Sequence, residues 1–350
     1  MRDSEVFVVF RVAGGPHIGF GHLRRCWTLA SLLREQAVDA QFVAASPEAG
    51  AILTGAGFAV NSEAHPDSLD QTFRALRKAP PPMVCVVDDP YVPTAGLLAV
   101  RQYAPALCID DTCERFFPVD LVVNGSVGAE TLPYHGESDT RYLLGPSYIL
   151  LRRSFARDPN RSAPPKAIHR VLVLMGGGET ETLTQEIVMV ITGLLPDVFV
   201  DVVSGPFGTL PAFDGPRYRH VTVHRAPDDL RSLMLDADLA VSGGGQTAYE
   251  LAATATPTLG IRLARNQAIN LRGLAEAGAL KDLGSPDDSG FDRRLADALL
   301  NLVHDRGARQ MMGTSGRRLV DGRGAERVVT YLKALALGVP LPKGAGSCRA

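Results

Sequence analysis

A histidine stands at the predicted start of a helix, directly after a loop of small residues. The stretch GPHIGFGHLRRCWTLA places glycines before His22 and an apolar, helix-like run after it. Glycines allow a close approach of the backbone to a ligand, and the N–H groups at a helix N-terminus suit a phosphate or a developing anion. We therefore predict that His22 acts as a general base and that Gly21 contacts substrate. The alternative is that His22 only caps a turn.

A second candidate site follows a strand-like run in the other half of the chain. The stretch ADLAVSGGGQTAYELAATATPTLGI, residues 237–261, has glycines between this run and the next helix. Successive backbone amides at a helix N-terminus form a nest that binds anions. Glu250 falls about two turns into that helix, where it can accept two ribose hydroxyls or simply face solvent. The residues assigned to this substrate site are Ser242, Gly244, Gly245, Gln246, Thr247 and Glu250.

Amide side chains and another glycine run extend the candidate binding residues. Asn266 and Gln267 precede a helical run, and amides suit sugar hydroxyl and acetamido groups, although Asn266 could instead be an N-cap. In MGGGETETLT, residues 175–184, Gly177 either contacts phosphate or forms a tight turn. This run lacks the GK[ST] ending of a Walker loop, and the His22 loop lacks the G-x-G-x-x-G spacing of dinucleotide sites. No cofactor is therefore predicted.

Acidic residues end two neighbouring strand-like runs. Asp88 and Asp89 close the run VVDD and precede Tyr91, while Asp110 and Asp111 close the run CIDD. Asp89 or Tyr91 is placed to face the reaction, whereas Asp88 could equally cap the next helix. The four acids are compatible with a metal, but Mg²⁺ usually recruits substrate phosphate as well. The phosphates are assigned to the other half of the chain, so no metal is predicted.

The composition is that of an ordinary soluble globular protein. A chain of 350 residues predicts two domains. The formal charge of −2 gives no electrostatic footprint for nucleic acid or an anionic membrane. Neither a run of roughly 18 apolar residues nor a signal peptide is evident, so we expect a cytoplasmic monomer without membrane insertion. The five scattered cysteines favour reduced thiols over disulfides or a zinc site.

Short strand-like runs alternate with amphipathic helical runs along the chain. This rhythm is typical of parallel sheets with helical crossovers, and a proline-rich stretch interrupts it once. We predict an α/β protein with an N-terminal Rossmann-like domain at 1–155, a linker at 156–166, a second Rossmann-like domain at 167–335 and a loose tail at 336–350. Both domains would be doubly wound, with the carboxyl ends of their strands facing one cleft.

Several of these motifs recur together in one known family. IGFGHLRRCWTLA, VVDD, CIDD, LLGPSYILLRRSF, VLVLMGGGETETLT and the 237–261 stretch occur here in the order found in UDP-2,4-diacetamido-2,4,6-trideoxy-β-L-altropyranose hydrolases of pseudaminic acid biosynthesis. The sequence resembles this PseG/SpsG-like family over roughly residues 5–285. The family also includes spore-coat polysaccharide proteins, and it is more distantly similar to the lipid-II-forming N-acetylglucosaminyltransferase.

The resemblance implies a GT-B fold with UDP bound mainly by the C-terminal domain, and no metal. It also implies that His22 is the catalytic histidine, that Asn266 contacts the sugar and that Glu250 binds the ribose. Two departures fall in the sugar pocket. The family loop R-x-D-x-S is Arg11-Val12-Ala13-Gly14-Gly15 here, and the tyrosine of D-H-Y or D-S-Y comes one position later, in Asp88-Asp89-Pro90-Tyr91. The sugar carried therefore stays open.

Together these observations predict an enzyme that releases UDP from a UDP-activated 2,4-diacetamido-2,4,6-trideoxyhexose. Water attacks the anomeric carbon, His22 takes its proton, Tyr91 positions sugar or water, and Arg11 or Arg24 neutralises substrate charge or is structural. The alternatives are a GT-B glycosyltransferase with an acceptor hydroxyl in place of water, and a non-catalytic binding module. Residues 45–82 lack the basic amphipathic stretch that would dock a lipid acceptor, which favours the hydrolase.

Overall fold

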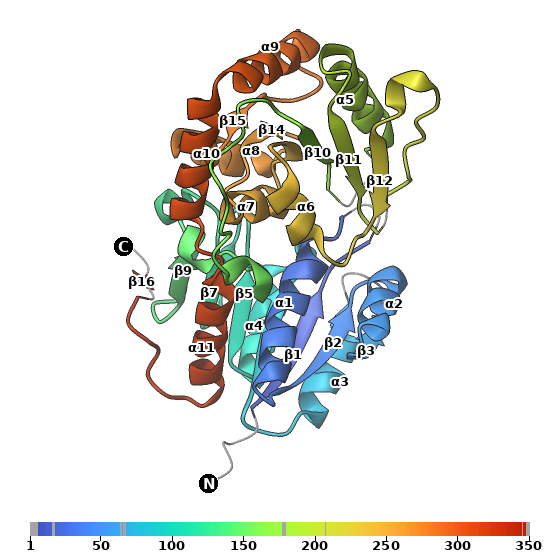
Figure 1. The fold of residues 1–350 in the computed structure, drawn as a ribbon. Coiled ribbons are helices and arrows are strands. Elements are labelled where there is room, and N and C mark those ends of the chain that lie inside the picture. Colours follow the sequence, from blue (N-terminus) through green and yellow to red (C-terminus); the bar gives the residue numbers. More distant parts are fainter. Residues whose placement is uncertain are drawn as a thin grey trace. The chain divides into compact units, whose positions relative to one another are not determined.

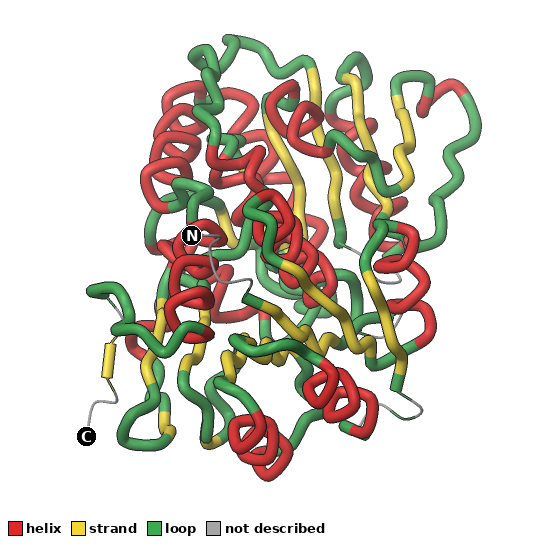
Figure 2. Tube along the Cα trace, turned by 90° about the horizontal axis from the view of Figure 1, so that it is seen from below, coloured by secondary structure: helices red, strands yellow, loops and turns green. Residues whose placement is uncertain are grey.

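The computed structural model describes residues 6–15, 18–63, 65, 68–176, 180–206, 208–344 and 346–347. The chain divides into two compact units, each with its own sheet (Figure 1). The first unit comprises residues 1–153 and 323–350, and the second comprises residues 154–322. Helices lie alongside the strands of each sheet (Figure 2). The predicted α/β class is confirmed.

The first unit is built on a sheet whose described strands run in the order β16-β9-β7-β5-β4-β1-β2-β3. All neighbours are parallel except β16 and β9. The strands are apolar and mostly buried, as expected for a parallel sheet covered on both faces. They are β1 (Phe7–Val12), β2 (Asp39–Ala44), β3 (Ala59–Ser62), β4 (Met83–Asp88), β5 (Ala106–Ile109), β7 (Leu121–Asn124), β9 (Arg141–Leu144) and β16 (Gly346–Ser347), while β6 (Phe116–Phe117) and β8 (His135–Gly136) form a separate pair.

Helices cover both faces of this first sheet. Side chains of α3 and α4 join one apolar cluster with alternate residues of β1, β2, β4, β5 and β7. Helices α1 and α11 pack on each other and against strands of the same sheet. The helix bounds are α1 (Gly21–Glu35), α2 (Pro47–Gly55), α3 (Asp70–Lys78), α4 (Thr94–Tyr103) and α11 (Gly324–Ala336), with single 3-10 turns η1 (Ala129–Thr131) and η2 (Pro146–Tyr148).

The second unit repeats the architecture with the order β12-β11-β10-β13-β14-β15, all parallel. Helices α5 and α9 share an apolar cluster with the central strands. The strands are β10 (Arg170–Leu174), β11 (Phe199–Ser204), β12 (Val221–Arg225), β13 (Leu239–Gly243), β14 (Thr258–Ile261) and β15 (Lys281–Asp282). The helices are α5 (Glu181–Leu194), α6 (Leu230–Asp236), α7 (Gln246–Ala253), α8 (Gln267–Glu276), α9 (Phe291–His304) and α10 (Arg306–Leu319), with η3 (Arg153–Ala156) and η4 (Pro216–Tyr218).

In both sheets the strand order changes direction at the first strand, so that later strands lie on both of its sides. β1 lies between β2 and β4, and β10 lies between β11 and β13. In open α/β sheets this switch point, at the carboxyl ends of the strands, is where ligands bind. The loops after β1 and β4, and after β10 and β13, are therefore the expected ligand-binding loops of each unit.

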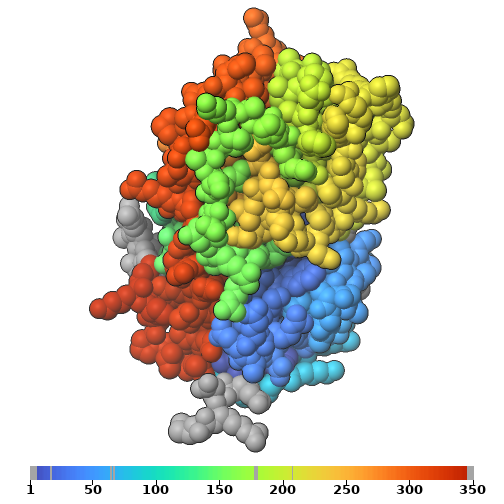
Figure 3. All heavy atoms as spheres, in the orientation of Figure 1, coloured from blue at the N-terminus to red at the C-terminus, as the bar shows by residue number. Residues whose placement is uncertain are grey.

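The C-terminal end of the chain differs from the sequence-based division. Residues 323–350 belong to the first unit, because α11 packs its apolar face against α1 and η2. Figure 3 shows this red segment beside the blue residues of the N-terminal region. The second unit therefore ends at residue 322 rather than 335. The predicted tail also contains β16, which pairs with β9.

The predicted linker is attached to the second unit by two arginines, the partly buried Arg161 and the fully buried Arg309. Arg161 donates to the carbonyls of Met234 and Ala237, and Arg309 donates to the carbonyl of Pro165 at 2.5 Å. Burial lowers the pKa of both guanidinium groups. Composition alone predicts a linker because little of the segment is apolar. In the structure its Pro165 carbonyl accepts from Arg309, and its own Arg161 donates to carbonyls of the second unit.

Candidate active site

His22 is the second residue of α1, and the loop 13–20 separates this helix from the end of β1. This loop is folded back on itself: Gly15 and Gly19 form an isolated antiparallel bridge, and Gly19 has a φ of 85°. Pro16 and His17 lie outside the described residues. The N-cap of α1 is Phe20, and no side chain caps this helix end. His22 is therefore not a helix cap, and its imidazole has a different partner.

That partner is the carboxylate of Asp88, at the carboxyl end of β4. Asp88 pairs in register with Val12, the last residue of β1, so the sheet itself brings the carboxylate beside the loop that carries His22. Nδ1 of His22 lies 2.7 Å from Oδ1 of Asp88. Because a carboxylate only accepts, Nδ1 must carry a proton in this contact. In the neutral imidazole, Nε2 then keeps the lone pair that a general base needs.

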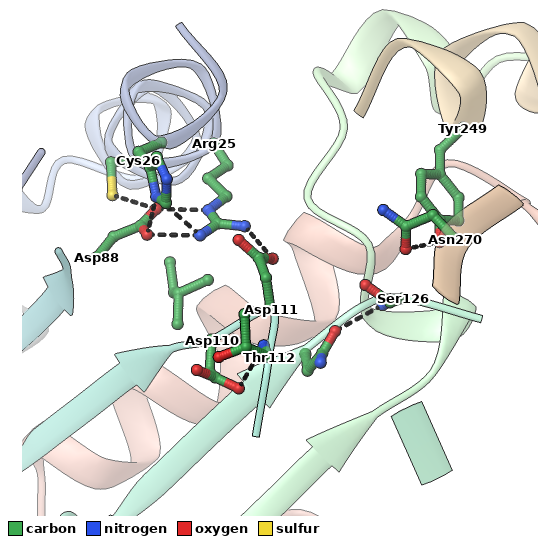
Figure 4. Close-up of polar contacts among 12 residues, drawn as sticks. Arg25, Cys26, Asp88, Asp110, Asp111, Thr112, Ser126, Tyr249 and Asn270 are labelled. Carbon is green, nitrogen blue, oxygen red and sulfur yellow. Dashed lines mark hydrogen bonds and ion pairs between the residues drawn. The ribbon is translucent and has the colours of Figure 1, made fainter. Parts of the chain in front are cut away.

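Arg25, one turn after His22, binds the same carboxylate with two donors. Its Nε lies 2.5 Å from Oδ2 of Asp88 and its second amino nitrogen lies 2.6 Å from Oδ1, while its other amino nitrogen donates to Asp111 at 2.6 Å (Figure 4). Burial alone would raise the pKa of Asp88, but the charges and hydrogen bonds of Arg25 and His22 hold it well below its usual value. Asp88 therefore stays an anion and keeps His22 oriented.

The other predicted residues of this sheet edge have partners within the protein. Asp89 forms a 2.8 Å ion pair with Arg11, and both side chains are fully buried. Asp89 also accepts from the backbone N–H of Tyr91, whose side chain is 52% exposed. Asp110 accepts from the hydroxyl of Tyr134 at 2.7 Å and from backbone amides. Substrate roles for Arg11 and Tyr91 stay predictions.

The acids of this edge are separated by cations rather than gathered around a vacant centre. No group of three or more histidines, cysteines, aspartates and glutamates suited to a metal occurs in the described parts of the chain. Asp88, Asp89 and Asp111 instead each face an arginine. The structure also places Asp88 away from the capping role considered from sequence, because α4 has Pro93 as its N-cap with no side-chain cap.

The glycines of the second unit let α8 approach the end of β13 closely. A Cβ on Gly244 would lie 2.4 Å from Cγ of Leu271, so no larger residue fits there without displacing α8. The N–H of Gly244 donates to the carbonyl of Ile261 and to Oε1 of Gln267. Asn270 donates to the carbonyl of Gly244 and accepts from the hydroxyl of Tyr249 (Figure 4).

The predicted substrate residues of this unit lie around the start of α7 and α8. Ser242 is fully buried at the end of β13, and Gly245 is the N-cap of α7, with Gln246 and Thr247 in its first turn. Glu250 is buried rather than solvated, being 5% exposed. Asn266 is exposed and its side chain does not cap α8, whereas Gln267 bonds the backbone of Gly244 and Leu263. Gly177 lies outside the described residues.

The second unit also has a cavity of about 490 Å³, which is lined by other residues than the predicted substrate residues. It is formed by the start of α5 and by the loops that follow β14 and β15. All three segments lie at the carboxyl edge of the sheet, where ligands bind in this class of fold. Its lining residues are Thr180, Glu181, Thr182, Leu183, Arg262, Leu263, Ser285, Pro286 and Asp287.

The contacts that hold His22, whose catalytic role stays a prediction, could not be predicted from its local sequence. Arg25 and Asp88 are 63 positions apart, and Arg25 and Asp111 are 86 apart. No local spacing reveals such a contact. The available signal was indirect: Asp88 ends a predicted strand, and Arg25 is one helical turn from His22.

Comparison with known proteins supports the family resemblance. The chain is 25% identical over 229 residues to the spore coat polysaccharide biosynthesis protein SpsG of Bacillus subtilis, covering 62% of this chain and 65% of that protein. It is 25% identical over 268 residues to a Helicobacter pylori protein named pseudaminic acid cytidylyltransferase and UDP-2,4-diacetamido-2,4,6-trideoxy-β-L-altropyranose hydrolase, covering 75% of this chain and 46% of that protein. The chain thus spans about half to two thirds of these relatives. No known family model matches it.

Solved structures with the same fold are glycosyltransferases of the GT-B class. MurG of Acinetobacter baumannii superposes with a TM-score of 0.65 at 16% identity, covering 94% of this chain and 99% of that one. The spinosyn rhamnosyltransferase SpnG in complex with thymidine diphosphate gives a TM-score of 0.62 at 17% identity, covering 93% and 99%. The predicted GT-B fold is therefore confirmed. None of the helices that the structure describes is long and apolar enough to cross a membrane.

Proposed function

We propose that this chain, a PseG/SpsG-like protein with a GT-B fold, is a hydrolase that releases UDP from a UDP-activated 2,4-diacetamido-2,4,6-trideoxyhexose. The observation that carries the proposal is the partly buried His22–Asp88 contact of 2.7 Å at the switch point of the first sheet. A histidine oriented by a carboxylate, with Nε2 left to accept a proton, is the arrangement that general-base catalysis requires.

In the proposed reaction, water attacks the anomeric carbon of the sugar. Nε2 of His22 takes a proton from the water, and the bond between the anomeric carbon and the β-phosphate oxygen breaks, with its electrons leaving on UDP. The imidazolium that forms is stabilised by Asp88, which stays ionised because of Arg25. UDP carries the negative charge, and the second unit supplies its binding groups.

For the second unit we propose that the α7 N-terminus binds the phosphates and Glu250 the ribose. Gly245 to Thr247 start this helix, and its dipole favours the growing charge on the β-phosphate. Asn266 is exposed one residue before α8 and is assigned to the acetamido sugar. Gln267 is assigned a supporting role through its bonds to Gly244 and Leu263. The protein is proposed to act in the cytoplasm, as a monomer.

A second candidate is a GT-B glycosyltransferase in which His22 activates an acceptor hydroxyl instead of water. Solved structures with this fold include proteins named as transferases, among them the rhamnosyltransferase SpnG and a glycosyltransferase of Rickettsia africae. The same His22–Asp88 pair would serve either reaction, because both remove a proton from an O–H nucleophile. The two candidates differ only in what occupies the nucleophile position, so an experiment with water as the sole nucleophile separates them.

The test is UDP release from a panel of UDP-2,4-diacetamido sugars and UDP-N-acetylglucosamine in ¹⁸O-labelled water without added metal. Release with the label on the sugar supports attack at the anomeric carbon. Label on UDP would mean attack at phosphorus and would overturn the His22 mechanism. Tight UDP binding without any release would favour the transferase, and sugar transfer to an added acceptor would then confirm it.

A further inference from the structure

We infer that Arg25 and Asp111 are positioning residues that act on His22 through Asp88 and shift its protonation in opposite directions. The inference rests on the proposed role of His22 as the base. It assigns a function to two residues that lie within the motifs IGFGHLRRCWTLA and CIDD but have no part in the proposed substrate contacts. The four side chains form a continuous series of contacts, His22–Asp88–Arg25–Asp111, in which Asp88, Arg25 and Asp111 alternate in charge.

The contacts in this series are short, and the exposed fraction of the side chains increases from Asp88 to Asp111. Asp88 is 1% exposed, Arg25 is 14% exposed and Asp111 is 30% exposed. One oxygen of Asp88 accepts from both His22 and Arg25, and a guanidinium nitrogen lies 3.0 Å from Nδ1 of His22. Any change in the charge of Arg25 therefore acts on the imidazole both directly and through the shared carboxylate.

Arg25 opposes protonation of His22. A guanidinium at this distance disfavours a second positive charge on the ring, and it also neutralises the carboxylate that would favour one. The positive charge of Arg25 is itself secured: burial would lower its pKa, but Asp111 and Asp88 raise it well above its usual value. Arg25 thus counteracts the tendency of Asp88 to favour a positive charge on the imidazole.

Asp111 acts in the opposite direction. Its carboxylate holds the guanidinium from the side remote from His22 and offsets part of its charge. Without Asp111 the cation near the imidazole is less compensated, so protonation of His22 becomes harder. Removal of Arg25 and removal of Asp111 should therefore shift the titration midpoint of His22 in opposite directions. Loss of packing alone would not give opposite shifts.

The remaining charged or titratable groups near His22 are the same in all variants. Asp89 is directed to Arg11, and Asp110 is directed to Tyr134 and backbone amides. The thiol of Cys26 contacts Asp88 at 3.5 Å, and burial together with Asp88 raises the pKa of this thiol well above its usual value, so it stays neutral. These groups set a constant background for the comparison.

The test is the titration of the His22 imidazole by NMR in the intact protein, with its signal assigned by its loss in His22→Ala. A charge within a few ångströms shifts a titration by about one to three units. We therefore expect the midpoint to rise by about one pH unit in Arg25→Gln. In Asp111→Asn it should fall by roughly half a unit, because Asp111 is farther from the ring. Arg25→Lys keeps the charge and should stay near wild type.

The chain offers a matched control for these variants. Arg101 also lies between two aspartates, Asp120 at 3.1 Å and Asp139 at 2.6 Å, and Asp139 is 68% exposed. Asp139→Asn should leave the His22 midpoint unchanged. Shifts of the same sign in Arg25→Gln and Asp111→Asn, or shifts no larger than in the control, overturn the inference. Because the midpoint needs no turnover, this result is separate from the outcome of the UDP-release experiment.

Discussion

The two sheets share the order of six parallel strands, yet the residues around His22 in the first unit and around the start of α7 in the second are of different kinds. In the first unit this region carries buried charges that neutralise one another, with His22, Asp88 and Arg25 in mutual contact. In the second unit this region carries glycines and amide side chains, with Gly244 bonded to Gln267 and Asn270.

We interpret this difference as a separation of roles between the two units. Charges fixed in a buried network can move a proton at a defined atom, because the network orients the base and sets its protonation. Glycines and a helix N-terminus instead present backbone groups to a ligand and suit phosphates and hydroxyls. The proposal therefore places the proton transfer in the first unit and UDP binding in the second.

The sharpest way to break this comparison is to remove the base. We expect His22→Ala to lower kcat by about 10²- to 10⁴-fold, the contribution of a positioned general base, while UDP affinity stays within about threefold of wild type. His135→Ala, at an exposed histidine of the same unit, is the control. Turnover by His22→Ala above a tenth of wild type, with a normal melting temperature, would exclude His22 as the base.

The division between the units was only partly visible in the sequence. The apolar runs that became β1, β4, β10 and β13 were located to within a few residues, because buried parallel strands are continuously apolar. The return of α11 to the first unit was missed, since an amphipathic helix does not indicate which sheet its apolar face will cover. His22 was found from its local loop, while Asp88 and Arg25 required a contact between distant segments.

A second test asks whether the close packing of α8 on Gly244 requires a residue without a side chain at this position. Gly244→Ala would place its Cβ 2.4 Å from Cγ of Leu271, and overpacking of this kind costs about 1–3 kcal/mol. We expect a lower melting temperature and weaker UDP binding. In Gly245→Ala the nearest atom to the new Cβ is 3.6 Å away, so the free energy of unfolding should fall by less than about 1 kcal/mol.

A cavity made by shortening Leu271 gives the decisive control for this substitution. If the clash is the cause, Gly244→Ala should cost less in a Leu271→Ala background than in wild type, because the added methyl group then has room. Equal costs in both backgrounds would mean that Gly244 is required for another reason.

The proposed ribose contact predicts a smaller effect, confined to binding. Glu250→Gln keeps the size of this buried side chain and removes its charge. Hydrogen bonds to a charged acceptor contribute about 1.5–3 kcal/mol, so loss of the charge should weaken UDP binding by about tenfold while kcat at saturation changes little. Glu276→Gln, at an exposed position of α8, is the control. A fall in kcat without a change in UDP affinity would contradict the assignment.

The last prediction concerns the pH dependence of stability and compares the buried carboxylate of Asp88 with the exposed one of Asp139. The folded-state pKa of Asp88 lies below its unfolded value, so the stability it contributes is present above the unfolded pKa and is lost as the pH falls through the folded one. The urea midpoint of wild type should therefore exceed that of Asp88→Asn most near pH 6, and the gap should narrow as the pH falls below about 4. The exposed Asp139→Asn should show only a small gap throughout, because a surface ion pair contributes little. A gap for Asp88→Asn that does not change with pH would mean that Asp88 does not act as a buried anion.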